Sequence, residues 1–186
     1  MAKHTILIVD DEQNILATLN RILRSEDRNL LLAENATVGL ELLKKAGGAD
    51  LVISDNRLPD MIGIDFLVKV RQLYPDTIRI LVTGYPDLDS AIHAINKGQV
   101  YRFIPKPWEN DELNLTVRQA LEYADILREN RILLNIARKQ AEWLRNIKDK
   151  YQVTQDEFDK MGLYIIEEKK VSETLDEFIK KYYPPK

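Results

Sequence analysis

Acidic side chains follow two of the apolar runs in this chain. Asp10 and Asp11 stand at the end of the first run, and Asp55 follows the run Asp50–Ser54. Carboxylates crowded into one pocket are unfavourable unless a cation is present, and an oxygen-rich site suits Mg²⁺, which keeps several waters and leaves room for a phosphoryl oxygen. A carboxylate beside such a cation can also act as a nucleophile and hold a phosphoryl group. The three residues therefore predict a phosphate site with Mg²⁺, in which Asp55 is best placed to carry the phosphoryl group.

Two further residues complement this acidic set. Thr83 and Lys106 end the fourth and fifth apolar runs. A threonine hydroxyl can donate a hydrogen bond to a phosphoryl oxygen, and a lysine brings an ammonium on a flexible stem. Both side chains therefore fit the same predicted phosphate site.

Short apolar runs alternate with amphipathic stretches up to about residue 116, which is typical of βα units around a parallel sheet. The predicted strands are Thr5–Asp10, Asn29–Ala33, Asp50–Ser54, Thr77–Thr83 and Tyr101–Ile104. The predicted helices are Asn14–Arg24, Thr37–Lys45, Gly63–Tyr74, Leu88–Asn96 and one that starts near Glu109. Ile, Leu and Val are dense in the first, third and fourth strands, so we expect these three to be the most buried.

The predicted sheet explains how the distant polar residues could meet. In a doubly wound parallel sheet, the active crevice lies at the carboxyl ends of the strands, near the switch in strand order. Right-handed crossovers make the first and third strands neighbours. Asp10, Asp11 and Asp55 are therefore expected to share one pocket.

Each of these signals has an ordinary structural alternative when it is taken alone. Asp10 and Asp11 could form a solvated turn or cap a helix. Lys106 with the following proline could simply end a strand, and Thr83 with Gly84 could be plain turn chemistry. Only the full set, with one member at each strand end, favours a phosphate site over these readings.

A long helix is predicted beyond the fifth strand. No proline or glycine occurs from Leu113 to Tyr151, and apolar residues recur at helical spacing. We expect a domain that accepts the phosphoryl group in residues 1–120, a long amphipathic or coiled-coil helix in 121–151 and a short helical segment in 152–186. The apolar seam predicts a homodimer, and packing by the last segment onto the same helix is an open alternative. The seam consists of Ile126, Asn130, Leu133, Ala137, Ala141, Leu144, Ile147 and Tyr151.

Composition excludes several classes of function. The 186 residues are 45% hydrophobic and 31% charged, with a formal net charge of −3 and no cysteine. Thiolate metal sites and disulfides are excluded, and no apolar run approaches the roughly 20 residues that span a bilayer. We therefore expect a cytoplasmic protein without a membrane partner. No segment concentrates the positive charge that nucleic-acid binding requires, so DNA binding is not favoured.

Four segments of the sequence together resemble the receiver domain of two-component response regulators. They are Ile6–Glu12, Asp55–Gly63, Leu81–Gly84 and Phe103–Pro107, each at a predicted strand end. The resemblance runs through about residue 120. It implies a flavodoxin-like fold, an α/β doubly wound sheet of five parallel strands in the order 2-1-3-4-5.

The resemblance also implies a role for each site residue. Asp55 resembles the phosphoacceptor, and Thr83 and Lys106 resemble the switch hydroxyl and the lysine of the site. Asp11 and Asp55 resemble the direct Mg²⁺ ligands, with the backbone carbonyl of Arg57 as another, whereas Asp10 resembles a ligand that acts largely through water.

The family's switch aromatic corresponds to Phe103, which has no hydroxyl and could signal only through burial of its ring. Arg57 and Tyr85 stand at the two positions that tune hydrolysis in the family. Because both are large, we expect a long-lived acyl phosphate.

The implied function is a phosphorylation-controlled switch. A sensor histidine kinase or a phosphotransfer protein would phosphorylate Asp55, and the output would be a change in protein–protein contacts. The only chemistry expected is self-catalysed phosphorylation and dephosphorylation. A DNA-binding transcription regulator is one alternative, disfavoured by the formal charge of −2 on residues 151–186. A receiver fragment of a larger enzyme, such as a cyclic-dinucleotide phosphodiesterase or a hybrid kinase, is another.

Overall fold

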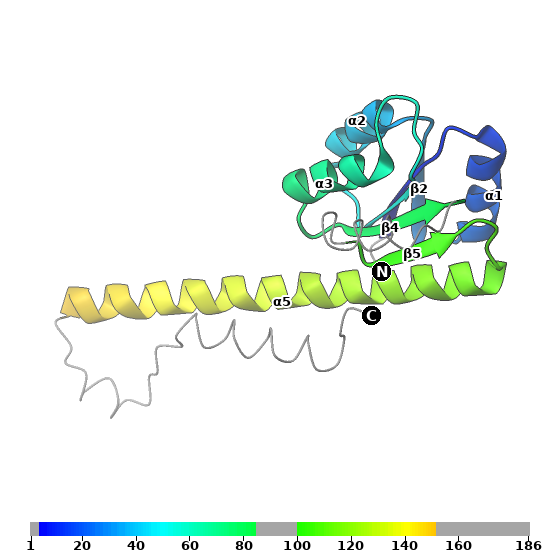
Figure 1. Cartoon of the computed structure of the whole chain (residues 1–186). Helices are drawn as coiled ribbons and strands as arrows, with labels where there is room; N and C mark the ends of the chain where they lie inside the picture. Colours follow the sequence, from blue (N-terminus) through cyan, green and yellow to red (C-terminus); the bar gives the residue numbers. More distant parts are fainter. Residues whose placement is uncertain (1–3, 85–99, 152–186) are drawn as a thin grey trace. The chain divides into compact units, whose positions relative to one another are not determined.

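The computed structural model describes residues 4–84 and 100–151 of the chain. Its contacts divide the chain into two compact units, Met1–Asp125 and Ile126–Lys186. The strands are β1 (His4–Val9), β2 (Arg28–Ala33), β3 (Leu51–Asp55), β4 (Ile78–Thr83) and β5 (Arg102–Pro105). The helices are α1 (Gln13–Leu23), α2 (Ala36–Ala46), α3 (Gly63–Leu73) and α5 (Asn110–Tyr151) (Figure 1).

The five strands form one parallel sheet in the order β2-β1-β3-β4-β5. This order confirms the predicted fold class, and every described element begins and ends within one residue of its predicted bound. The central strands β1, β3 and β4 are the most buried, as expected, whereas β2 and β5 lie at the edges. The predicted helix Leu88–Asn96 lies outside the described residues.

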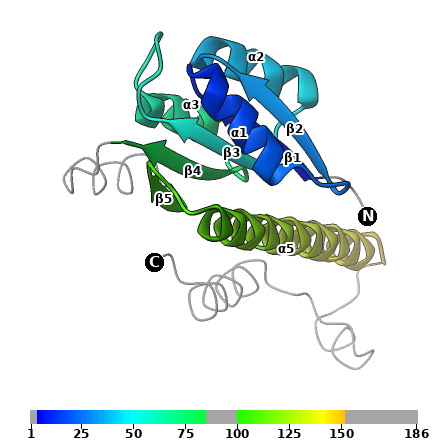
Figure 2. The same cartoon turned by 90° about the vertical axis from the view of Figure 1, so that its right-hand side faces the viewer.

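Two helical layers cover the sheet. One core contains Leu7 and Val9 of β1 together with Phe66, Leu67 and Val70 of α3. Because side chains alternate along a strand, Ile6 and Ile8 of β1 point to the other face. Figures 1 and 2 show α1 and the first turns of α5 across the sheet from α2 and α3. The buried side chains of these helices include Leu16, Leu19, Leu23, Leu113, Val117 and Ala120.

Local sequence accounts for the bounds of α2. The Asn35 side chain accepts a hydrogen bond from the Val38 amide at 2.9 Å, which caps the start of the helix. Gly47 ends it with a φ of 75°, a left-handed conformation that glycine adopts without steric cost. The helix is therefore held in place at its amino end, which faces the acidic ends of the strands.

The long helix predicted beyond the fifth strand is confirmed as α5, a helix of 42 residues. Its residues up to Asp125 belong to the first unit and the later ones to the second. In the second unit, burial differs along the predicted seam: Ala141 and Leu144 are buried, but Leu133 is 57% exposed. Residues 152–186 lie outside the described part of the chain.

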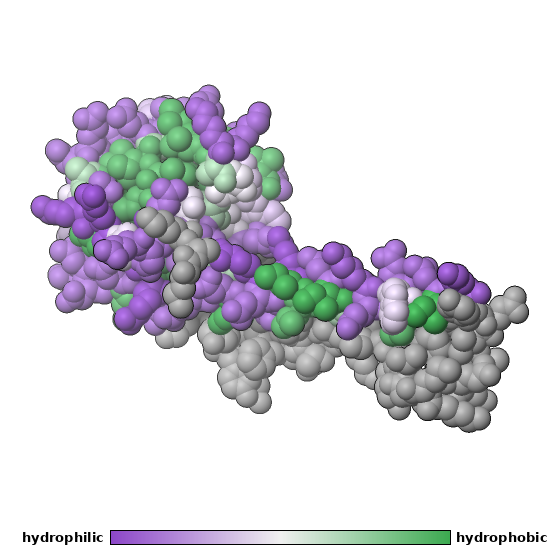
Figure 3. Space-filling view, turned by 180° about the vertical axis from the view of Figure 1, so that it is seen from behind, coloured by the Kyte–Doolittle hydropathy of each residue, from purple (hydrophilic) through white to green (hydrophobic). Residues whose placement is uncertain are grey.

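Apolar side chains lie on the surface of the later part of α5 (Figure 3). We call this set the exposed stripe; it consists of Ile132, Leu133, Ile136 and Trp143. Among the described ranges, no helix combines the length and the apolar character needed to cross a membrane.

Candidate functional site

The polar residues predicted from the strand ends meet at the carboxyl end of the sheet. Asp10 directly follows β1, Asp55 is the last residue of β3, Thr83 is the last residue of β4, and Lys106 directly follows β5. Three of the side chains are almost completely buried: Asp10 is 2% exposed, Asp55 7% and Thr83 5%. Burial of carboxylates at this density requires a compensating positive charge.

Lys106 supplies that charge. Its Nζ donates a hydrogen bond to Asp10 Oδ2 at 2.8 Å and lies 2.7 Å from Asp55 Oδ1. The Lys106 backbone amide donates to the Thr83 carbonyl at 2.8 Å, which anchors the lysine beside β4. One ammonium therefore bridges two carboxylates that are 45 positions apart in the sequence.

The bridge and the burial act oppositely on the pKa values of its members. Burial raises the pKa of Asp10 above its usual value, and the hydrogen bond from Lys106 offsets this only in part. For Lys106, burial lowers the pKa, but the hydrogen bonds to Asp10 and Asp55 and the negative charges of these two carboxylates together raise it. Lys106 therefore stays charged at neutral pH, as a partner of phosphoryl oxygens must.

Asp11 differs from the buried pair, because its side chain is exposed. In residues 4–84 and 100–151, no three acidic, histidine or cysteine side chains are arranged as ligands of one cation. Mg²⁺ does not need such a cage, since it is usually bound by one or two carboxylates, with waters filling its other positions. The hard oxygen donors of Asp10, Asp55 and the adjacent exposed Asp11 therefore fit Mg²⁺.

The loop between β3 and α3 holds Asp55 from the other side. The Arg57 amide donates a hydrogen bond to Asp55 Oδ2. Arg57 and Ile62 form an antiparallel bridge across the loop, and the Gly63 amide donates to the Asn56 carbonyl at 2.8 Å. A Cβ at Gly63 would lie 1.9 Å from the Asp55 carbonyl oxygen, so only glycine fits there. The loop is thus packed tightly against the backbone of the proposed phosphoacceptor.

The remaining predicted residues occupy varied positions. Phe103 is partly buried against the core of α2 and α3. Tyr85, predicted to limit hydrolysis, lies outside the described residues, and the Arg57 side chain is exposed.

Two contacts were missed at the sequence level. His4 Nδ1 lies 3.8 Å from Asp50 Oδ2, and His4 Nε2 lies 3.5 Å from Asp125 Oδ2. Asp60, in the middle of the β3–α3 loop, contacts the amino end of α2. The type of Asp60 indicated only a turn, and nothing in the sequence pairs it with a helix 23 residues earlier.

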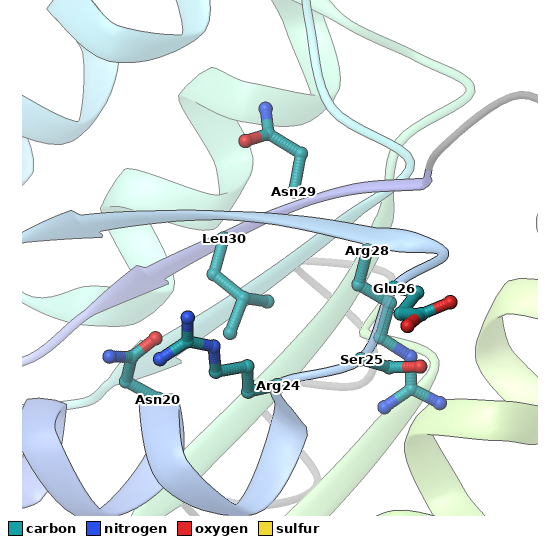
Figure 4. Close-up of a pocket in the computed structure, with 7 residues that line it drawn as sticks. All are labelled: Asn20, Arg24, Ser25, Glu26, Arg28, Asn29 and Leu30. Carbon is teal, nitrogen blue, oxygen red and sulfur yellow. The ribbon is translucent and has the colours of Figure 1, made fainter.

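A surface cavity of about 590 Å³ lies at the opposite end of the sheet, between the end of α1 and the start of β2 (Figure 4). Its lining consists of Asn20, Arg24, Ser25, Glu26, Arg28, Asn29 and Leu30. Arg24 extends toward Asn20, whereas Arg28 lies beside Glu26 and Ser25. Because the cavity contains none of the strand-end residues, it has no part in chemistry at Asp55.

The fold and the site together define a class: a flavodoxin-like α/β domain with a lysine-bridged pair of buried carboxylates at the carboxyl end of its sheet. The family model for the response regulator receiver domain matches residues 6–118. The chain therefore belongs to the response regulator receiver family.

Known relatives support this assignment. The hydrogenase transcriptional regulatory protein HoxA of Bradyrhizobium diazoefficiens is 38% identical over 63% of this chain and 24% of its own length. The C4-dicarboxylate transport transcriptional regulatory protein DctD of Rhizobium meliloti is 34% identical over 77% of this chain and 31% of its own. This chain thus spans about a quarter to a third of the length of these relatives.

Solved structures show the same similarity. The signal receiver domain of an HD domain-containing protein from Pseudomonas fluorescens Pf-5 is 43% identical, with a TM-score of 0.65. The similarity covers 69% of this chain and 94% of that domain. The match therefore covers nearly all of that receiver domain and about two thirds of this chain.

Proposed function

We propose that this chain is a phosphorylation-controlled response regulator that accepts a phosphoryl group on Asp55. The observation that carries the proposal is the bridge of Lys106 to both Asp10 and Asp55, at 2.8 and 2.7 Å, at the carboxyl end of the sheet. This arrangement places a nucleophilic carboxylate next to a fixed positive charge. A phosphoryl group on Asp55 would therefore lie beside the Lys106 ammonium.

The proposed chemistry is the transfer of a phosphoryl group from a donor to the Asp55 carboxylate. An oxygen of the Asp55 carboxylate forms a bond to phosphorus, while the bond from phosphorus to the donor atom breaks and the donor leaves with the bonding electrons. Lys106 offsets negative charge on the phosphoryl oxygens, and the buried Thr83 offers a hydroxyl at the end of the neighbouring strand.

Mg²⁺ would complete the site. Asp11, Asp55 and the Arg57 carbonyl would hold the ion, and Asp10 would act largely through a water molecule. The ion would neutralise charge that develops on the transferred group. The support for Mg²⁺ is the kind of donor atom, because these residues offer hard oxygens at or next to the buried pair of carboxylates.

The proposed donor is a sensor histidine kinase or a phosphotransfer protein, and the proposed output is a change in protein–protein contacts. The exposed stripe on α5 supports a homodimer, because a second copy would remove these apolar side chains from water. HoxA and DctD are transcriptional regulators by name, so regulation of transcription is the second candidate. The charge of −2 on residues 151–186 speaks against direct DNA binding by this chain.

The test uses acetyl phosphate, a small phosphodonor, in buffer with Mg²⁺. Intact-mass analysis should show one added phosphoryl group on the wild-type protein and none on Asp55→Ala. Asp111→Asn, which changes an exposed carboxylate in the first turn of α5, is the matched control and should be labelled like the wild type. Equal labelling of Asp55→Ala and the wild type would remove Asp55 from the proposed role.

A further inference from the structure

Asp60 makes three hydrogen bonds to the amino end of α2. Its Oδ1 accepts from the Ala36 amide at 3.1 Å, and its Oδ2 accepts from the Thr37 amide at 2.8 Å and from Thr37 Oγ1 at 2.6 Å. The hydrogen bond from the Thr37 hydroxyl, followed by those from the two amides, lowers the pKa of Asp60. The carboxylate is therefore ionised and held at a helix end that favours negative charge.

These contacts go beyond what α2 needs for a local cap. The Asn35 side chain already accepts from the Val38 amide, as a residue at that position usually does. Asp60 takes the amides of Ala36 and Thr37, which otherwise have no partner inside the helix. Because Asp60 comes 23 residues after Thr37, its contacts tie the helix to a different loop, which the Asn35 cap does not do.

That loop is the one that carries the phosphoacceptor. Its base is closed by the bridge between Arg57 and Ile62 and by the Gly63 amide, while the Arg57 amide holds Asp55. Asp60 lies between Arg57 and Ile62, so it fixes the middle of the loop from outside. The Arg57 carbonyl, the backbone ligand expected for Mg²⁺, thus lies between an anchor on Asp55 and an anchor on α2.

A second contact joins the same region to the loop after β1. Gln13 Nε2 at the start of α1 donates to Glu34 Oε1, just before α2, at 3.0 Å. The loops that follow β1, β2 and β3 are therefore connected in series around one side of the acidic pocket. This contact is a single hydrogen bond, whereas Asp60 makes three, so it is the weaker of the two.

We propose that Asp60, with Thr37, is a positioning residue that holds the Arg57 carbonyl and Asp55 in the arrangement that binds Mg²⁺. The proposal rests on the proposed function at Asp55. Asp60 acts through the loop and touches neither the ion nor the phosphoryl group. Without it the loop loses the anchor that fixes its middle, and the hydrogen bonds at its base open more often.

The main test compares Asp60→Ala with Asn35→Ala. Each variant removes hydrogen bonds from the first turn of α2, and only Asp60→Ala releases the β3–α3 loop. By calorimetric titration, Asp60→Ala should weaken Mg²⁺ binding about tenfold, the low end of the effect of groups that orient metal ligands. Asn35→Ala should bind Mg²⁺ like the wild type. Equal affinity of Asp60→Ala and the wild type, or an equal loss in Asn35→Ala, would overturn the proposal.

Two further measurements separate positioning from general destabilisation. In metal-free protein, amide hydrogen exchange at Arg57 and Gly63 should be faster in Asp60→Ala and unchanged in Asn35→Ala. Thr37→Ser, which keeps the hydroxyl, should bind Mg²⁺ like the wild type, whereas Thr37→Ala should bind it more weakly. Unchanged exchange in Asp60→Ala would contradict the proposal. If wild-type protein itself neither bound Mg²⁺ nor accepted a phosphoryl group, the proposed function would fail instead.

Discussion

Replacement of Lys106 by methionine should expose the electrostatic cost of the buried carboxylate pair. Methionine has a similar length and no charge, so the change removes the ammonium with little loss of volume. Because Lys106 Nζ lies 2.8 Å from Asp10 Oδ2 and 2.7 Å from Asp55 Oδ1, these oxygens are at most about 5.5 Å apart. Without the lysine they would face each other as two negative charges.

The size of the effect follows from that separation. With an effective dielectric constant of about 20, two unit charges about 5.5 Å apart repel each other by about 3 kcal/mol. Burial already raises the pKa of Asp10, so proton uptake by Asp10 would relieve part of this repulsion. We therefore expect Lys106→Met to lower the free energy of unfolding at pH 7 by about 1 to 3 kcal/mol.

Urea unfolding in buffer with a chelator measures this loss, and Lys69→Met is the matched control. Lys69 is exposed on α3, so its replacement should change stability by less than about 0.5 kcal/mol. Saturating Mg²⁺ should restore more stability to Lys106→Met than to the wild type, because the ion replaces the missing charge. A Lys106→Met protein as stable as Lys69→Met without metal would refute the electrostatic reasoning.

Three other changes have expected outcomes. Gly63→Ala should cost about 3 kcal/mol in the free energy of unfolding, because the methyl group would clash with the Asp55 carbonyl. Gly84→Ala should be nearly neutral in thermal unfolding, because among the described residues its methyl group would meet only Lys106 Cβ, at 3.9 Å. The folded protein lowers the pKa of Asp60, so metal-free Asp60→Ala should be less stable than the wild type at pH 7, and this difference should shrink below about pH 4. A difference that stays constant down to pH 3 contradicts this. Light scattering should give a dimer for the full chain and a monomer when Leu133 and Ile136 are both replaced by lysine, and a monomeric full chain would rule out the dimer.

The fold could be predicted because its strands and helices have strong local signals. The central strands β1, β3 and β4 are covered on both faces, so their sequences are nearly continuous runs of Ile, Leu and Val. The described helices show apolar residues at helical spacing, and α2 and α3 end close to Gly47 and Pro75. The two edge strands were also found, since β2 and β5 keep enough apolar residues to alternate with the helices.

The later part of α5 was harder to interpret. Helical spacing alone placed Leu133, Ala141 and Leu144 on one seam, but the structure buries only Ala141 and Leu144. A helix of this length carries more apolar residues than a single seam can hold, so periodicity does not decide which of them face a neighbour. The exposed stripe around Ile136 became visible only from the exposure of each side chain.

The candidate site shows why some functional contacts follow from sequence and others do not. Lys106 reaches Asp10 across 96 positions, yet its place is set by pairing between strands, since Thr83 lies opposite Pro105 and accepts from the Lys106 amide. Residues at strand ends are placed by the regular pairing of neighbouring strands, so the strand order alone brings them together. No such pairing places Asp60, because the path of its loop depends on packing around Gly63. A residue that tunes the site from a loop is therefore expected to escape sequence patterns, even where the residues that it positions are evident.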